Sequence, residues 1–290
     1  MKFITAKKDA QIFVGLVDSA QKQVVDLNSL GFPYADMNAL IAGLSAADQQ
    51  KLAALAANGF SGCANVFPLS QLCLLAPIPR PLHDVICLGL NYAEHIAETG
   101  LEKTEEPMYF SKRAAITTGH MGTVDGNFSV DSSLDYESEL AVIIGKHCRN
   151  VRAENAQDVI FGYTVFNDFS ARTLQRKRKQ FFLGKSGDGF CAMGPWIVTD
   201  DEISFPPELQ NICRINGELR QSSNTRYMLH SIPAIIADIT RSITLEPGDI
   251  IATGTPSGVG LRFNPPKFLK SGDTVECEIE KIGILQTTIK

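Results

Sequence analysis

The feature that most constrains this chain is a pair of carboxylates, Glu137 and Glu139, at the start of the apolar, largely β-branched run 140–144. Residues two apart on a strand point to the same face. A strand here would therefore hold both carboxylates close together beside residues that belong to a core. Two such charges about 4 Å apart repel by roughly 4 kcal/mol at an effective dielectric near 20. The pair is stable there only if one carboxyl is protonated or a cation lies between them.

A third carboxylate, Asp168, follows a second strand-like run, residues 161–166. An isolated Asn-Asp pair at such a place is more typical of a turn or a helix N-cap. Beside the Glu137 and Glu139 pair, however, Asp168 is a candidate third ligand. Hard oxygen ligands of this kind favour Mg²⁺, Mn²⁺ or Ca²⁺ over zinc.

His95 and Glu98 are three residues apart, so on a helix their side chains would be neighbours on one face. A carboxylate that accepts from one imidazole nitrogen leaves the other nitrogen as a base near neutral pH, as general-base catalysis on a water requires. Taken alone, a His-x-x-Glu pair is more often a surface pair. The spacing is compatible with both interpretations.

Two glycine-rich segments also carry candidate site residues. Residues 253–260 are a turn of small residues in which backbone amides can converge on an anion, although a tight β-turn after a strand has the same composition. Residues 184–190 contain Lys185, but they lack the G-x-x-x-x-G-K-[ST] pattern of a phosphate-binding loop.

Taken in order, these motifs resemble the fumarylacetoacetate hydrolase family. The resemblance runs from about residue 80 to the C-terminus, through segments 86–95, 137–139, 184–186 and 249–260 together with Asp168. It implies a metal site, a water-activating dyad on a mobile lid of about residues 91–106, a lysine that faces the metal, and substrate contacts. The residues implied are Glu137, Glu139 and Asp168 for the metal; His95 and Glu98 for the dyad; Lys185; and Gln175, Thr255 and Gly254 for the substrate.

The resemblance implies cleavage of a carbon–carbon bond next to the ketone of a small 2-oxo acid, with Mg²⁺ or Mn²⁺ as cofactor and an enolate stabilised by the cation and Lys185. Two reactions fit. The dyad would serve hydrolysis of an acylpyruvate or fumarylpyruvate-type 1,3-diketo acid, whereas decarboxylation of oxaloacetate needs little base. Segments 179–185 and 264–270 resemble bacterial members that act on oxaloacetate-like acids, which favours small dicarboxylic substrates.

Other members of the family are isomerases, sugar-acid diketone hydrolases and ureidoglycolate lyases, and the motifs here do not separate these activities. A protein of a different class, a non-catalytic binding module that has kept the fold, is disfavoured. Loss of catalysis should appear as a missing ligand or dyad residue, and every one is present.

Composition predicts an ordinary soluble, cytoplasmic protein. A formal net charge of −5 argues against non-specific binding to nucleic acid. The N-terminus lacks the apolar core of a secretory signal, and no apolar stretch reaches the 18 or so residues that a membrane span needs. Seven cysteines without a C-x-x-C pair argue against a disulfide framework or a zinc site. By the resemblance we expect a homodimer.

The expected fold is mainly β with some α structure. Residues 1–74 predict a small α+β domain, with a hairpin in 2–26 and helical spacing in 35–57. Three prolines at alternate positions make 75–82 an extended linker. Residues 83–290 would then form the catalytic domain, for which the resemblance implies a β-roll or sandwich. Its expected strands are 85–90, 140–145, 161–166, 195–199, 211–216, 250–253 and 274–287.

Overall fold

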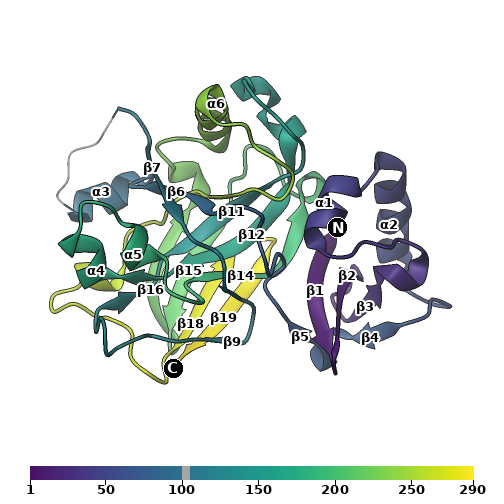
Figure 1. Ribbon diagram of the computed structural model, residues 1–290, viewed down its shortest axis with the longest axis horizontal. Helices are drawn as coiled ribbons and strands as arrows, with labels where there is room; N and C mark the ends of the chain where they lie inside the picture. The colour runs from purple at the N-terminus through teal and green to yellow at the C-terminus, as the bar shows by residue number, and fades with distance from the viewer. Residues whose placement is uncertain (100–104) are drawn as a thin grey trace.

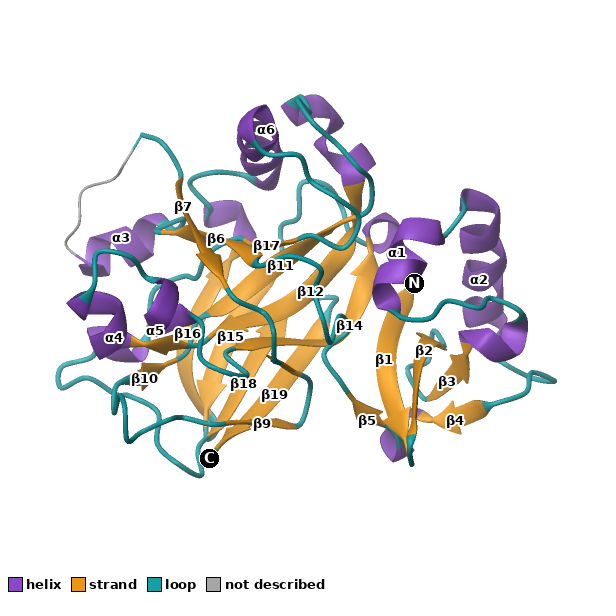
Figure 2. Cartoon of the chain, in the orientation of Figure 1, coloured by secondary structure: helices purple, strands orange, loops and turns teal. Residues whose placement is uncertain are grey.

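The computed structural model describes residues 1–99 and 105–290, so part of the predicted lid, residues 100–104, lies outside the described residues. Two β-sheets dominate the molecule, and short helices cover its edges (Figures 1 and 2). The prediction of a mainly β protein with some α structure is confirmed. No helix in the described part of the chain is both long and apolar enough to cross a bilayer.

The larger sheet has twelve strands and follows the order β4-β3-β2-β1-β14-β12-β11-β17-β6-β7, with β5 beside β1 and β8 beside β14. Its strands are β1 (Lys2–Lys8), β2 (Gln11–Val17), β3 (Gln23–Asp26), β4 (Val66–Pro68), β5 (Cys73–Leu74), β6 (Val85–Gly89), β7 (Met108–Lys112), β8 (Thr117–Thr118), β11 (Ser138–Ile144), β12 (Ile160–Asp168), β14 (Cys191–Thr199) and β17 (Ile250–Ala252).

The smaller sheet has five strands, in the order β16 (Glu218–Asn224), β15 (Gln210–Ile215), β18 (Thr274–Ile279), β19 (Gly283–Ile289) and β9 (Gly122–Val124). A two-stranded ribbon joins β10 (Leu134–Asp135) to β13 (Ser170–Ala171). The α-helices of the described residues are α1 (Met37–Gly43), α2 (Ala46–Asn58), α3 (Ala93–Thr99), α4 (Arg172–Lys177), α5 (Phe182–Lys185) and α6 (Ile232–Ser242). Short 3₁₀ segments are η1 (Leu27–Leu30), η2 (Leu69–Gln71), η3 (Ala153–Val159), η4 (Asp200–Glu202), η5 (Thr225–Tyr227) and η6 (Gly260–Arg262).

Strand β11 is buried along its whole length, as its unbroken apolar run predicts for a strand covered on both faces. Its side chains alternate between two core clusters. Leu140 and Val142 belong to a cluster shared with the smaller sheet, whereas Ala141 and Ile143 belong to a cluster shared with the N-terminal helices. Glu139 follows the second alternation, so its side chain lies on the face away from the smaller sheet.

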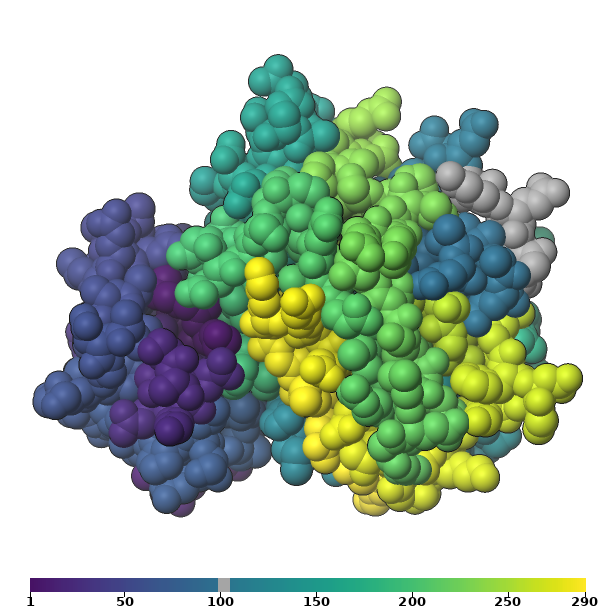
Figure 3. Space-filling model, turned by 180° about the vertical axis from the view of Figure 1, so that it is seen from behind, coloured from purple at the N-terminus to yellow at the C-terminus, as the bar shows by residue number. Residues whose placement is uncertain are grey.

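The N-terminal segment continues the larger sheet. Strand β1 pairs with β14 in an antiparallel ladder, with Lys2 opposite Val198, and the expected hairpin between β1 and β2 is present. Helices α1 and α2 lie beside these strands at one end of the molecule (Figures 1 and 3). The larger sheet contains strands from both sides of the expected linker, residues 75–82. The division into domains 1–74 and 83–290 therefore stays a prediction.

Several elements were not expected from the sequence, among them β7, β16 and α6. Helix α6 buries Ile232, Ile235, Ile236 and Ile239 on one side and packs against η3. The run 274–287, expected as one strand, is a hairpin, because Lys281 and Gly283 adopt positive φ angles of 64° and 139° and reverse the chain between β18 and β19.

The packing of α6 generates a matched stability prediction. Ile236 is fully buried, while Ile243, which caps the same helix, is 49% exposed. Truncation of a buried isoleucine removes apolar burial and leaves a cavity, so Ile236→Ala should lower the free energy of unfolding by about 2–5 kcal/mol. Ile243→Ala should change it by about 0.5 kcal/mol or less. Urea denaturation of both variants measures the difference, and equal effects would contradict the packing described for α6.

Candidate active site

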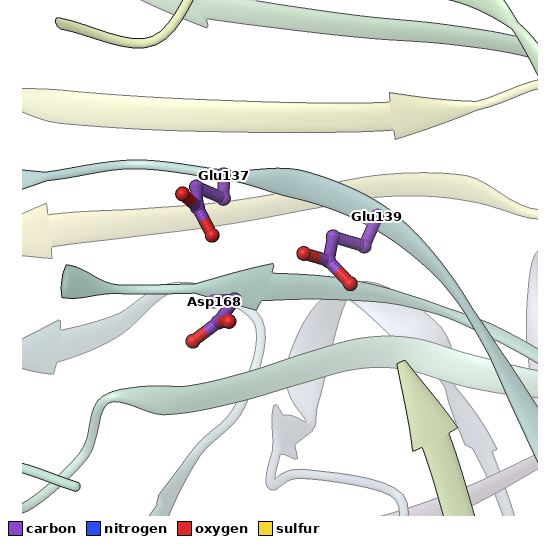
Figure 4. Close-up of side chains that lie close together, drawn as sticks. All are labelled: Glu137, Glu139 and Asp168. Carbon is purple, nitrogen blue, oxygen red and sulfur yellow. The ribbon is translucent and has the colours of Figure 1, made fainter. Parts of the chain in front are cut away.

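The three predicted metal ligands converge in the structure. Each of Glu137, Glu139 and Asp168 offers a carboxylate oxygen, these oxygens all lie within 4.8 Å of one another, and all three residues are buried (Figure 4). Glu139 is the second residue of β11, Glu137 directly precedes that strand, and Asp168 is the last residue of β12. The Asp168 amide donates to the Glu137 carbonyl at 2.9 Å, so pairing of the two chain segments fixes the cluster.

Two buried lysines contact these carboxylates. Lys185 Nζ lies 2.5 Å from Glu137 Oε2 and 2.7 Å from Asp168 Oδ2. Lys112, at the end of β7, donates to the other oxygen of Asp168 and, at 2.9 Å, to the carbonyl of Phe169. Lys185 was expected beside the metal ligands, whereas Lys112 was not predicted.

Arg172, the first residue of α4, was also missed. Its Nη2 donates to Glu137 Oε1 at 2.7 Å, its Nε donates to Asp135 Oδ2 at 2.8 Å, and its Nη1 donates to Gln175 Oε1 at 3.1 Å. All three guanidinium nitrogens therefore donate to protein acceptors. Gln175, predicted to contact the substrate, is oriented by this bond.

Glu139 has the least support of the three ligands. Its Oε2 accepts from the Gly254 amide at 2.8 Å, and no cation in the described part of the chain pairs with it. Burial raises the pKa of Glu139 well above its usual range, and the charges of Asp168 and Glu137 raise it further. Burial also opposes ionisation of Glu137, but the charges of Lys185 and Arg172 outweigh it and lower the pKa of Glu137 to about 2.

The charge of this cluster fits a divalent cation. Four buried carboxylates face three cations: Glu137, Glu139, Asp168 and Asp135 against Lys112, Lys185 and Arg172. When Glu139 is ionised, one negative charge is left over in this buried site, where an uncompensated charge is costly and the pKa of Glu139 is therefore raised. A hard cation with oxygen ligands would compensate it, and Glu137, Glu139 and Asp168 are the residues that would hold it.

The predicted dyad is formed on α3. His95 Nδ1 lies 2.7 Å from Glu98 Oε1, and Glu98 Oε2 accepts from the Gly258 amide at 3.1 Å. An ionised carboxylate can only accept, so the contact favours a proton on Nδ1 and leaves Nε2 as the basic nitrogen. The neighbouring Glu94 accepts a hydrogen bond from Ser223, which links the same helix to β16.

A cavity of about 270 Å³ lies beside these groups. Its wall includes six of the nine predicted site residues: His95, Glu137, Glu139, Gln175, Lys185 and Thr255. The other three contact members of that set: Asp168 contacts Lys185, Glu98 contacts His95, and Gly254 contacts Glu139. The wall is completed by Leu88, Gly89, Leu90, Met108, Phe110, Arg172, Arg176, Phe181, Val259, Leu261 and Arg262.

The turn at 253–260 holds two predicted substrate residues, Thr255 and Gly254, and only Thr255 is in the wall of the cavity. Thr255 lines the cavity, and its hydroxyl donates to the Ser138 carbonyl at 3.0 Å while accepting from Gln221 Nε2 at 2.8 Å. The Gly254 amide is used by Glu139. Gly254 has φ +95°, and a Cβ there would lie 2.9 Å from the Asn91 side chain, so the turn requires glycine at this position.

Comparison with known proteins identifies the family of the chain. The model of the fumarylacetoacetate (FAA) hydrolase C-terminal family matches residues 84–290. The chain is 42% identical to oxaloacetate tautomerase YisK of Bacillus subtilis (strain 168) over 100% of both chains. It is 43% identical to the mitochondrial oxaloacetate tautomerase FAHD2A of Homo sapiens, over 76% of this chain and 70% of the relative.

Solved structures give the same result. A fumarylacetoacetate hydrolase from psychrophilic Exiguobacterium antarcticum superposes with a TM-score of 0.85 at 36% identity, covering 100% of this chain and 99% of the other. Maleylpyruvate hydrolase from Sphingobium sp. SYK-6, solved with manganese(II) and pyruvate, superposes with a TM-score of 0.77 at 29% identity, covering 100% and 98%. The chain is therefore an enzyme that belongs to the fumarylacetoacetate hydrolase family.

Proposed function

We propose that this enzyme catalyses the keto–enol tautomerisation of oxaloacetate, with Mg²⁺ or Mn²⁺ held by Glu137, Glu139 and Asp168. The observation that carries the proposal is the convergence on one cavity of a carboxylate cluster that fits a divalent cation, a lysine ammonium and a histidine oriented by Glu98. Two relatives that are more than 40% identical are named oxaloacetate tautomerases, which supports the choice among the reactions open to the family.

The chemistry divides between a cation and the protein's own groups. When bound, a divalent cation would supply a Lewis acid that polarises the 2-oxo group. The Lys185 ammonium is held in place by carboxylates of the cluster, at 2.5 Å from Glu137 and 2.7 Å from Asp168. It therefore supplies a fixed positive charge near the enolate oxygen as that oxygen becomes negative. Arg172 holds Glu137 and Gln175 in place, so that neither has to reorganise during the reaction.

His95 moves the proton. In the keto-to-enol direction its basic Nε2 accepts a proton from the carbon next to the ketone, and the imidazolium then gives a proton to the enolate oxygen. Glu98 stabilises the imidazolium through the 2.7 Å contact at Nδ1. In total a C–H bond of the substrate is broken and an O–H bond is formed, while His95 gains a proton and loses it again. The reaction is therefore an isomerisation.

Decarboxylation of oxaloacetate and hydrolysis of an acylpyruvate are the second candidates, because both pass through the same enolate. The dyad beside the cavity suits the activation of a water, as hydrolysis requires. The chain also resembles a maleylpyruvate hydrolase, which supports hydrolysis as an alternative. Its identity to that hydrolase is 29%, lower than the 42% identity to the tautomerase of Bacillus subtilis. Pyruvate release separates both reactions from tautomerisation, which releases none.

Removal of one carboxylate tests the cation site. Glu139→Gln should abolish Mn²⁺ binding in calorimetry and lower turnover by at least about 100-fold. The fold should be retained, because burial and its neighbours already favour a neutral group at this position. Glu154→Gln, at a glutamate that is 63% exposed and paired with the surface residue Arg152, is the matched control. Unchanged Mn²⁺ affinity in Glu139→Gln would contradict the assignment.

Replacement of the histidine tests the proton transfer. His95→Gln should lower kcat for tautomerisation by about 10²–10⁴-fold, as loss of a general base does, and leave Mn²⁺ affinity unchanged. The control is His83→Gln, because His83 also contacts a carboxylate, at 2.6 Å from Asp249, but does not line the cavity. The assay follows the ultraviolet absorbance of enol oxaloacetate and, in the same sample, pyruvate. Equal rates in the two variants would count against His95 as the base.

A further inference from the structure

Four Lys or Arg side chains line the cavity within the described part of the chain: Arg172, Arg176, Lys185 and Arg262. Two of them are already neutralised. Arg172 donates from Nε and from both terminal nitrogens to Asp135, Glu137 and Gln175, and Lys185 is shared between Glu137 and Asp168. Their charges are therefore already compensated by carboxylates of the protein.

The other two cations, Arg176 and Arg262, have no hydrogen-bond or ion-pair partner among residues 1–99 and 105–290. Arg176 lies in the last turn of α4, and Arg262 ends η6. Both residues are exposed, so they lie at the outer part of the cavity, whereas the carboxylate cluster is buried. Two guanidinium groups that have no partner in the described residues therefore line the same cavity from different segments of the chain.

Arg176 and Arg262 line the same cavity, so their positive charges repel each other. Partial burial lowers the pKa of Arg262 below its ordinary value; Glu98 opposes this, and the charges of Arg176 and Arg172 lower the pKa further. An anion between Arg176 and Arg262 would relieve this repulsion. Guanidinium groups bind carboxylates with paired, charge-assisted hydrogen bonds, so a carboxylate is the anion that best fits them.

The spacing along α4 matches a short diacid. Arg172 contacts the metal ligand Glu137, and Arg176 is four residues further along the same helix face. One helical turn rises about 5.4 Å. That rise is comparable with the separation of the two carboxylates in a four-carbon acid whose 2-oxo end lies at the carboxylate cluster.

We propose that Arg176 and Arg262 bind the second carboxylate of the substrate and make this enzyme selective for dicarboxylic over monocarboxylic 2-oxo acids. The assignment rests on the proposed function for the identity of the reacting acid. Neither arginine is a metal ligand or a member of the dyad. The two arginines determine specificity and take no part in the proton transfer.

Binding of unreactive analogues tests the assignment without turnover. Malate and lactate share the same 2-hydroxy acid end, and only malate carries a second carboxylate. In calorimetry with Mg²⁺ present, the unaltered protein should bind malate at least about tenfold more tightly than lactate, as expected for charge-assisted hydrogen bonds. Arg262→Gln and Arg176→Gln should each reduce this preference, and the double variant should abolish it with lactate affinity unchanged.

Arg178→Gln is the matched control, because Arg178 follows the same helix and carries the same charge but does not line the cavity. It should keep the full preference for malate. A loss of preference in Arg178→Gln equal to that in Arg176→Gln would show a general charge effect and overturn the assignment. So would an unaltered protein that binds malate no more tightly than lactate.

Turnover separates failure of this assignment from failure of the proposed function. Oxaloacetate and its 4-methyl ester have the same reacting end, but the ester has no second charge. The double variant should lose at least about tenfold in kcat/KM for oxaloacetate and little for the ester. Equal losses for both compounds would overturn the role of the arginines and leave the tautomerase intact. If the unaltered protein turns over neither compound, the proposed function fails, and the malate preference still decides the role of the arginines.

Discussion

The buried contact between carboxylates and cations at the ends of β11 and β12 is the constraint on which the rest of the structure depends. Removing several charges from water costs several kcal/mol each unless partners are held in good geometry. Lys185, Arg172 and Lys112 come from three different elements, α5, α4 and β7, and each reaches the cluster. The positions of these elements around the sheet are therefore linked to one small site.

Strand register is what brings the carboxylates together. Glu139 lies opposite Phe166 in the ladder between β11 and β12, which brings Glu137 to the level of Asp168. A slip of one residue would turn Glu139 into the core shared with the smaller sheet and bring Leu140 to the cavity side. The slip is unfavourable because it would bury the Glu139 carboxylate among apolar side chains and remove its hydrogen bond from the Gly254 amide. The core thus fixes the geometry of the catalytic groups.

The site itself was largely predictable, because its signal is local or ordered along the chain. Two glutamates before an apolar run and an aspartate after a second one indicated the carboxylate cluster, and the family resemblance added the histidine and glutamate one helical turn apart that contact each other in the structure. Lys112 gave no comparable signal. It lies 56 residues from Asp168, and only the completed sheet brings the two together.

The fold was predictable where strands are apolar and less so elsewhere. Strand β16 has the sequence ELRQSSN, which alternates too weakly to indicate a strand, and it is held by its pairing with β15. The union of the N-terminal strands with the larger sheet depends on Lys2 pairing with Val198, a contact that no local pattern predicts. Gly254 illustrates the same limit. The resemblance implied that its amide contacts the substrate, whereas in the structure the amide donates to the Glu139 carboxylate.

The most direct test of the account is the interconversion of enol and keto oxaloacetate by the purified protein, followed together with pyruvate release, in Mg²⁺ or Mn²⁺ and then in excess chelator. We expect that the protein accelerates the interconversion, that chelator removes the acceleration, and that pyruvate is released far more slowly. Acceleration that persists in chelator would contradict the role given to the carboxylate cluster. Pyruvate release as fast as the interconversion would show that carbon–carbon cleavage, and not tautomerisation, is the reaction.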